Sequence, residues 1–241
     1  MEDRRQGIEF FRKGLLEFDI DLKENQLHQF IRYYELLTER NKVMNLTAII
    51  EFEEVITKHF LDSLSFVKVM RPTTERLLDI GTGAGFPGIP LKIVFPGLRV
   101  VLMDSLNKRI NFLEEVIREL ELKDIRAVHG RAEDFGKDRS FRESFDLCVS
   151  RAVAKLPVLS EYCLPYVKPG GFFIPYKSGI IEDELKDASR AVNMLGASIE
   201  GTEEFHIPGT EIGRTLILIH KIKATPLKYP RSAGKPVKEP L

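Results

Sequence analysis

The densest group of residues able to do chemistry lies in the glycine-rich segment 77–90, LLDIGTGAGFPGIP. Gly81, Gly83 and Gly85 follow one apolar run and precede another, which is typical of a nucleotide-binding turn between a strand and a helix. Glycines let the backbone turn sharply and approach a ligand closely. Residues 83–88 also fit the pattern G-x-G-x-x-G, so this segment alone leaves a nicotinamide-dependent oxidoreductase open.

Three acidic residues help to separate the candidate ligands. Asp104 ends the next predicted strand, where a carboxylate can accept both hydroxyls of a ribose, and both dinucleotides and S-adenosylmethionine carry that ribose. Asp79 directly precedes the glycines; it would repel a pyrophosphate but suits the cationic methionine end of S-adenosylmethionine. Glu133 follows the third predicted strand, where an acid and a backbone amide can hold adenine. Asp104 therefore does not separate the two ligands, whereas Asp79 favours S-adenosylmethionine.

Cationic residues mark two further places. Arg151 follows the fourth predicted strand, near the expected position of the transferred methyl group, although a strand-end arginine can also serve only to pair with an acid. Lys177 ends the fifth strand in a similar way and is a weaker candidate. Past the last strand, Pro-rich residues 224–241 form a predicted basic arm. Its candidate RNA-contacting residues, which could instead belong to a solvated tail, are Lys228, Arg231, Lys235 and Lys238.

The pattern of apolar residues predicts the elements that position these groups. Residues 1–74 are predicted to form a helical extension, and residues 75–223 to alternate strands with helices, which is typical of a parallel sheet. Two final β-like runs, 197–207 and 214–222, have no helix between them, so they should pair antiparallel. The other strands are predicted at 76–80, 99–104, 125–130, 145–150 and 171–176. The fold class is therefore α/β, a Rossmann-like, mostly parallel sheet that ends in an antiparallel hairpin.

Composition excludes several classes of protein. The chain has 241 residues, with 36 basic and 36 acidic residues, so any nucleic-acid contact must come from local clustering of charge. No apolar run approaches the length of a membrane span, and two cysteines in apolar surroundings cannot form a disulfide framework, so a reduced, cytoplasmic setting is expected. The five histidines have no metal-ligand spacing, and we expect no metal site.

In combination, seven segments resemble the bacterial 16S rRNA guanine-N7 methyltransferase G family, also called glucose-inhibited division protein B. They are NLT from residue 45, HFLDSL from 59, DIGTGAGFPGIPL from 79, DSLNKR from 104, RAE from 131, SRAVA from 150 and TPLKYPR from 225. The resemblance implies a class I S-adenosylmethionine-dependent fold, a cytoplasmic enzyme and methylation of one guanine in 16S rRNA of the small ribosomal subunit. It also implies cofactor contacts from Gly81, Phe86, the Ala132–Glu133 pair and Arg151.

The absence of other motifs agrees with this reaction. Cys148 lies in a predicted strand and Cys163 in a helix, where buried, unreactive thiols are expected rather than the nucleophile of a pyrimidine methylase. Guanine N7 has a free lone pair, so no proton must leave before it attacks, and we name no catalytic acid or base. Two alternatives stay open at this stage: the nicotinamide-dependent oxidoreductase and a non-catalytic RNA-binding protein that keeps the glycine loop.

Overall fold

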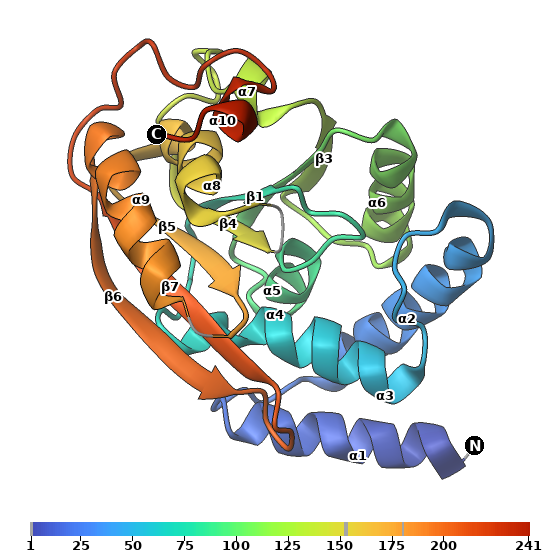
Figure 1. The fold of residues 1–241 in the computed structure, drawn as a ribbon. Coiled ribbons are helices and arrows are strands. Elements are labelled where there is room, and N and C mark those ends of the chain that lie inside the picture. Colours follow the sequence, from blue (N-terminus) through green and yellow to red (C-terminus); the bar gives the residue numbers. More distant parts are fainter. Residues whose placement is uncertain (1, 152–153, 180) are drawn as a thin grey trace.

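The strands form a seven-stranded sheet in the order β3-β2-β1-β4-β5-β7-β6, seen in a computed structural model that describes residues 2–151, 154–179 and 181–241 (Figure 1). Residues 152 and 153 of the SRAVA segment lie outside the described part. The strands are β1 Arg76–Ile80, β2 Arg99–Asp104, β3 Ile125–His129, β4 Phe145–Arg151, β5 Val167–Lys177, β6 Ala197–His206 and β7 Gly213–Lys221.

The pairing confirms the predicted fold class. β1 to β5 pair in parallel, whereas β7 pairs antiparallel with both β5 and β6. The expected limits of β1 and β2 agree with the structure, but β5 begins at Val167 rather than 171. Its early residues pair across a bulge, where Val167 lies opposite Phe145 and Phe172 opposite Leu147. The glycines that mark this irregular stretch made it look like a loop in the sequence.

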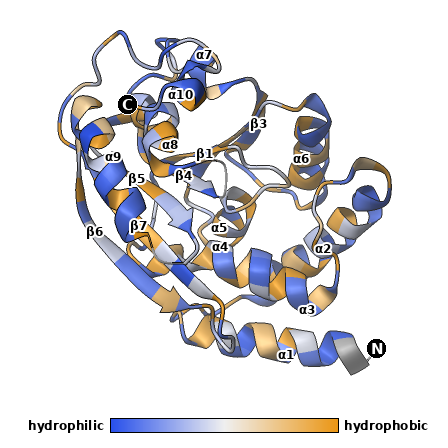
Figure 2. Ribbon diagram, viewed as in Figure 1, coloured by the Kyte–Doolittle hydropathy of each residue, from blue (hydrophilic) through white to orange (hydrophobic). Residues whose placement is uncertain are grey.

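Alternate residues of the central strands face two separate hydrophobic cores. Leu77 belongs to one core and the adjacent Leu78 to the other, as the two-residue period of a strand requires. Helices therefore cover both faces, and several of them show apolar and hydrophilic residues side by side (Figure 2). The helices after the first strand are α5 Gly88–Val94, α6 Asn107–Glu119, α7 Ala132–Phe135, α8 Leu156–Cys163, η3 Leu164–Tyr166 and α9 Glu182–Met194.

The helices before the first strand pack against the same core as one face of the sheet. Phe30, Tyr33 and Phe60 are almost completely buried together with Leu77. Tyr33 also donates a hydrogen bond to the carbonyl of Ala84 in the glycine-rich loop, at 2.5 Å. These helices are α1 Glu2–Leu16, α2 Glu24–Met44, α3 Phe52–Val55, the π-helix η1 Ile56–Leu61, α4 Asp62–Leu64 and the 3₁₀-helix η2 Ser65–Lys68. The predicted extension thus supports the loop directly.

The C-terminal residues fold back onto the molecule and do not form an extended arm. Arg142 donates hydrogen bonds to the carbonyls of Thr225, at 2.6 Å, and Tyr229, at 2.8 Å. The Tyr229 ring is buried, and the chain ends in the short helix α10 Lys235–Lys238 beside α7 and α8 (Figure 1). Within the described residues, no helix combines the length and apolar character needed to cross a membrane.

Candidate functional site

A cavity of about 570 Å³ opens at the carboxyl ends of β1, β2 and β3. In parallel α/β sheets, this edge is where ligands bind. Seven of the nine predicted cofactor residues line it: Gly81, Gly83, Phe86, Asp104, Ala132, Glu133 and Arg151. The structure thus brings together residues from four separate segments of the chain. The other two, Asp79 and Gly85, lie just outside the lining.

Asp79 lies beneath the loop and holds its shape. One of its carboxylate oxygens, Oδ2, accepts hydrogen bonds from the Thr82 hydroxyl, at 2.6 Å, and from the Gly88 amide, at 2.8 Å. Burial raises the pKa of Asp79 to about 6, although these two hydrogen bonds favour the charged form. The second oxygen, Oδ1, is buried and has no hydrogen-bond partner within the described residues.

Gly83 and Gly85 have different local surroundings. Both have a positive φ, +62° and +107° respectively, which disfavours any other residue. A Cβ on Gly83 would meet nothing within 4 Å, so this backbone faces open space at the cavity. A Cβ on Gly85 would lie 2.5 Å from the Ile89 side chain and 2.6 Å from the Tyr33 hydroxyl. Gly85 therefore allows the loop to pack against α2 and α5.

Asp104 is a buried carboxylate at the end of β2, on the cavity wall. Its Oδ2 accepts hydrogen bonds from the Gly83 amide and from the Arg109 guanidinium, each at 3.0 Å, and its Oδ1 accepts one from the Leu106 amide at 2.9 Å. Two carboxylate oxygens offer about four acceptor positions, so acceptor capacity remains. The loop amide thus fixes a carboxylate that can still accept hydroxyl groups.

Ala132 and Glu133 begin the short helix α7 on the opposite wall. The Ala132 carbonyl accepts a hydrogen bond of 2.6 Å from the Tyr166 hydroxyl, which fixes the start of the helix. Glu133 Oε1 accepts a hydrogen bond of 3.2 Å from the amide of Gly234, a residue of the C-terminal segment. The C-terminal segment therefore reaches the wall of this cavity, which its position in the sequence did not suggest.

Phe86, His59 and Arg151 form a stacked wall on the β4 side of the cavity. The rings of His59 and Phe86 are nearly parallel, with centroids 4.3 Å apart, and the Arg151 guanidinium lies 5.2 Å from the centroid of Phe86. Arg151 Nη2 lies 3.1 Å from His59 Nδ1, and His59 Nε2 lies 3.0 Å from the Thr47 hydroxyl. Nδ1 also lies 3.1 Å from the Lys58 carbonyl oxygen, so it accepts from Arg151 when the ring proton is on Nε2 and donates to Lys58 when the proton is on Nδ1.

The electrostatics of this wall keep His59 neutral. Burial and the adjacent positive charge of Arg151 lower the pKa of His59 to about 3. A second proton on the ring would also put a donor against the guanidinium. The contact of His59 with Arg151 also fixes the helices before the first strand against the sheet.

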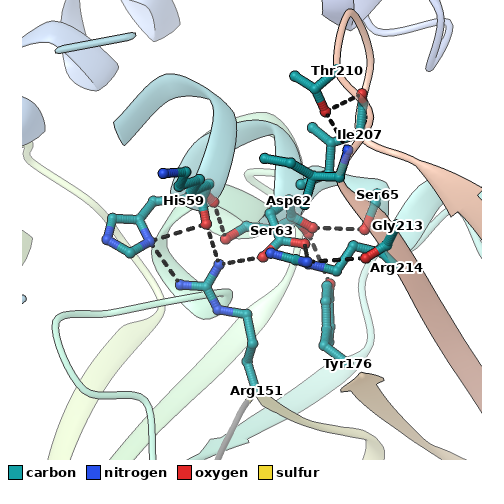
Figure 3. Close-up of polar contacts among 12 residues, drawn as sticks. His59, Asp62, Ser63, Ser65, Arg151, Tyr176, Ile207, Thr210, Gly213 and Arg214 are labelled. Atoms are coloured by element: carbon teal, nitrogen blue, oxygen red, sulfur yellow. Dashed lines mark hydrogen bonds and ion pairs between the residues drawn. The ribbon is translucent and has the colours of Figure 1, made fainter. Parts of the chain in front are cut away.

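Asp62 fixes the other side of Arg151 and links three elements (Figure 3). Its Oδ2 accepts a hydrogen bond of 2.8 Å from Arg151 Nη1, and its Oδ1 accepts one of 2.9 Å from Arg214 Nε on β7. The Asp62 side chain is only 3% exposed. Arg151 thus serves as the paired strand-end cation that the sequence left as an alternative, and it also lines the cavity.

The structure separates the four predicted RNA-contacting residues. Lys228, Lys235 and Lys238 are exposed, but the Arg231 guanidinium forms a two-pronged pair with Glu161, with Nε–Oε1 2.9 Å and Nη2–Oε2 2.6 Å. The Glu161 carboxylate is 1% exposed, so Arg231 neutralises a buried charge. This corrects the expectation for Arg231, which is engaged inside the protein and is not available to a phosphate.

Several residues that line the cavity were not identified from the sequence as site residues, and three of them have polar side chains from separate parts of the chain. Thr47 comes from the segment after α2, Arg109 from the first turn of α6 and Tyr162 from α8. Thr47 and Arg109 lie within the NLT and DSLNKR segments, which is the signal that could have identified them. Tyr162 has no such signal, because only the packing of α8 brings it to the cavity.

The residues present suit S-adenosylmethionine. The open space over Gly83, the spare acceptor capacity of Asp104 and the unpartnered Oδ1 of Asp79 provide room, acceptors for ribose and a negative charge near the loop. Arg109 Nε is likewise buried without a partner in the described residues.

Comparison with known proteins gives one consistent result. The family model GidB, described as rRNA small subunit methyltransferase G, matches residues 26–212. The chain is 59% identical over 232 residues to ribosomal RNA small subunit methyltransferase G of Lachnoclostridium phytofermentans, covering 96% of each chain. It is 54% identical over 231 residues to the protein of that name from Desulforamulus reducens, covering 95% of this chain and 96% of the relative. Among solved structures, a SAM-dependent methyltransferase from Aquifex aeolicus superimposes with a TM-score of 0.52 at 16% identity, covering 68% of this chain and 92% of the other.

Proposed function

The chain belongs to the rRNA small subunit methyltransferase G family, and from this premise we propose that it transfers a methyl group from S-adenosylmethionine to N7 of one guanine in 16S rRNA. The observation that carries the proposal is the cavity at the ends of β1 to β3, with Asp104 fixed at its wall by the loop amide of Gly83. The family match gives no support to the oxidoreductase or to the non-catalytic RNA-binding protein.

We assign the cofactor contacts by the chemistry of each wall. Asp104 would accept the ribose hydroxyls, and the Ala132–Glu133 pair would hold adenine. Gly81 and Gly83 would allow the methionine part to approach the backbone, with the charge of Asp79 beneath it. Gly85 would act indirectly, because it permits the packing that shapes the loop.

The chain contributes to the reaction chiefly by positioning. S-adenosylmethionine, when bound, supplies an electrophilic methyl group. Because N7 of guanine attacks with its own lone pair, no side chain has to remove a proton. His59 fits this requirement, because its neutral ring lies against both the Thr47 hydroxyl and the Arg151 guanidinium and so helps to hold the guanidinium in one orientation. We name no general base.

The substrate contact is proposed on local charge. Lys228, Lys235 and Lys238 are exposed on the C-terminal segment, whose Gly234 amide reaches Glu133 in the cavity wall. Phosphates bound by these lysines would lie beside the cofactor cavity. The substrate is 16S rRNA, either free or within the small subunit, and we place the enzyme in the cytoplasm with that substrate.

The direct test is methyl transfer from labelled S-adenosylmethionine to small ribosomal subunits that lack this modification. We expect one label per 16S rRNA, at N7 of one guanine, and its loss in Asp104→Ala. Label on another atom, or no label with either subunits or free rRNA, would refute the proposal.

A further inference from the structure

A second cavity, of about 610 Å³, lies beside the first, at the ends of β4 and β5. Among the described residues, the linings of the two cavities share only His59 and Arg151. Its volume lies in the range of small-molecule sites, ~300–1,000 Å³. Lys177 at the end of β5, a candidate site residue from the sequence that has no role in the proposed function, lines this second cavity.

The second cavity is cationic in a chain whose net charge is zero. Five basic side chains line it against two carboxylates, which belong to Asp62 and Glu184. Most of these cations are already paired: Arg151 and Arg214 with Asp62, Lys177 with Glu184 and Lys58 with Glu54. Lys155 is exposed and has no acidic partner among the described residues, so it can bind an anion.

The reaction itself restricts what can occupy this cavity. The attacking N7 atom and the methyl carbon must come within about 3–3.5 Å of each other. The acceptor base must therefore lie next to the cofactor cavity. A base in a folded RNA reaches such a cavity by leaving its stack, and its phosphate comes with it. The second cavity offers both an adjoining wall and a cation for that phosphate.

We propose that the second cavity binds the acceptor nucleotide, with its phosphate at Lys155 and its base against the His59–Arg151 wall; this rests on the proposed function. Three of the five N–H donors of Arg151 are used by Lys58, His59 and Asp62. A remaining donor can bind O6 of guanine, the atom next to N7 on the same edge. Adenine carries an amino donor there, so the same contact disfavours adenine.

The test uses Lys155→Glu, with Lys155→Arg as the conservative variant. Lys155 immediately precedes α8 as its N-cap, where a negative charge is compatible with the helix, so the reversal should fold. The matched control is Lys123→Glu. Lys123 is also exposed, and it lies just before β3, an edge strand of the sheet, and does not line the second cavity. Each variant is assayed for the KM for small subunits, for its salt dependence and for S-adenosylmethionine affinity by calorimetry.

We expect Lys155→Glu to raise the KM on the order of tenfold and to lower the salt slope by about 1, with unchanged cofactor affinity. Lys155→Arg and Lys123→Glu should behave like the wild type. If wild-type protein methylates subunits but Lys155→Glu has a normal KM, the acceptor site is refuted while the proposed function stands. Weakened cofactor binding in Lys155→Glu would also refute it, because the cavity would then belong to the cofactor. An inactive wild type would refute both.

Discussion

Asp62 is predicted to contribute strongly to stability through its buried charge, and Asp62→Asn tests this. Its carboxylate is 3% exposed, and its two partners, Arg151 and Arg214, are 15% and 20% exposed. The asparagine side chain has nearly the same shape as aspartate but no charge, so the two largely buried guanidinium groups lose their counter-charge. Breaking a buried pair from one side costs about 3–5 kcal/mol, a large part of a typical unfolding free energy of about 5–15 kcal/mol.

In urea unfolding, this loss appears as a lower midpoint urea concentration, while the slope of the unfolding free energy against urea concentration stays unchanged. The matched control is Glu119→Gln, which removes an ion pair of the same length, 2.9 Å to Arg32, whose side chains are 35% and 43% exposed. An exposed pair contributes about 0–1 kcal/mol. An Asp62→Asn variant that loses no more stability than Glu119→Gln would refute this role of the buried Asp62 charge.

Three further predictions follow from the geometry of single residues. Gly85→Ala should lower the unfolding free energy by about 2–4 kcal/mol, because its Cβ would lie 2.5 Å from the Ile89 side chain. Gly83→Ala should lower it by only about 1–2 kcal/mol but should weaken S-adenosylmethionine binding in calorimetry. His59, with its pKa lowered from 6.5 to about 3, stays neutral in the folded state while the unfolded chain takes up a proton below pH 6.5. Stability should therefore fall by up to about 1.4 kcal/mol per pH unit between pH 6.5 and 3, and His59→Asn should remove that part of the slope in urea titrations. Arg231→Gln should lower the unfolding free energy by about 3–5 kcal/mol, because it leaves the buried Glu161 carboxylate unpaired. Lys238→Ala should leave the unfolding free energy unchanged and reduce the salt slope of RNA binding by about 0.7–0.9. Equal effects of the two variants on stability would contradict this distinction.

The sheet could be predicted from the sequence because its signals are local. Each central strand is a short apolar run followed by a turn residue, and each crossover helix has its own apolar face. The missing helix between 207 and 214 was sufficient to predict the antiparallel hairpin of β6 and β7. Where a local signal is misleading, as in the glycines at 170 and 171, the predicted boundary is wrong by several residues.

The cavity wall from the glycine loop to Glu133 was equally predictable, because strand ends of a parallel sheet meet at one edge. The contacts of Arg151 with His59 and Asp62 on the β4 side were not predictable. Arg151 lies about ninety residues from His59 and Asp62 in the chain, and no period or spacing connects it to them. Their contact depends on how the first helices dock on the sheet, which is a property of the packed core.

The basic residues show why composition alone could not locate the RNA-binding surface. Lys221 and Arg231 are basic residues of the last twenty-one, yet Lys221 is fully buried and donates to the carbonyls of Leu164 and Val167. Burial lowers the pKa of Lys221 to about 8, so its charge serves the protein interior. A cation can bind phosphate only if the fold leaves its charge exposed and does not engage it with a buried partner, and that condition depends on tertiary contacts. By this criterion Lys155, outside the basic C-terminal segment, is a better candidate for a phosphate contact than Arg231 within it.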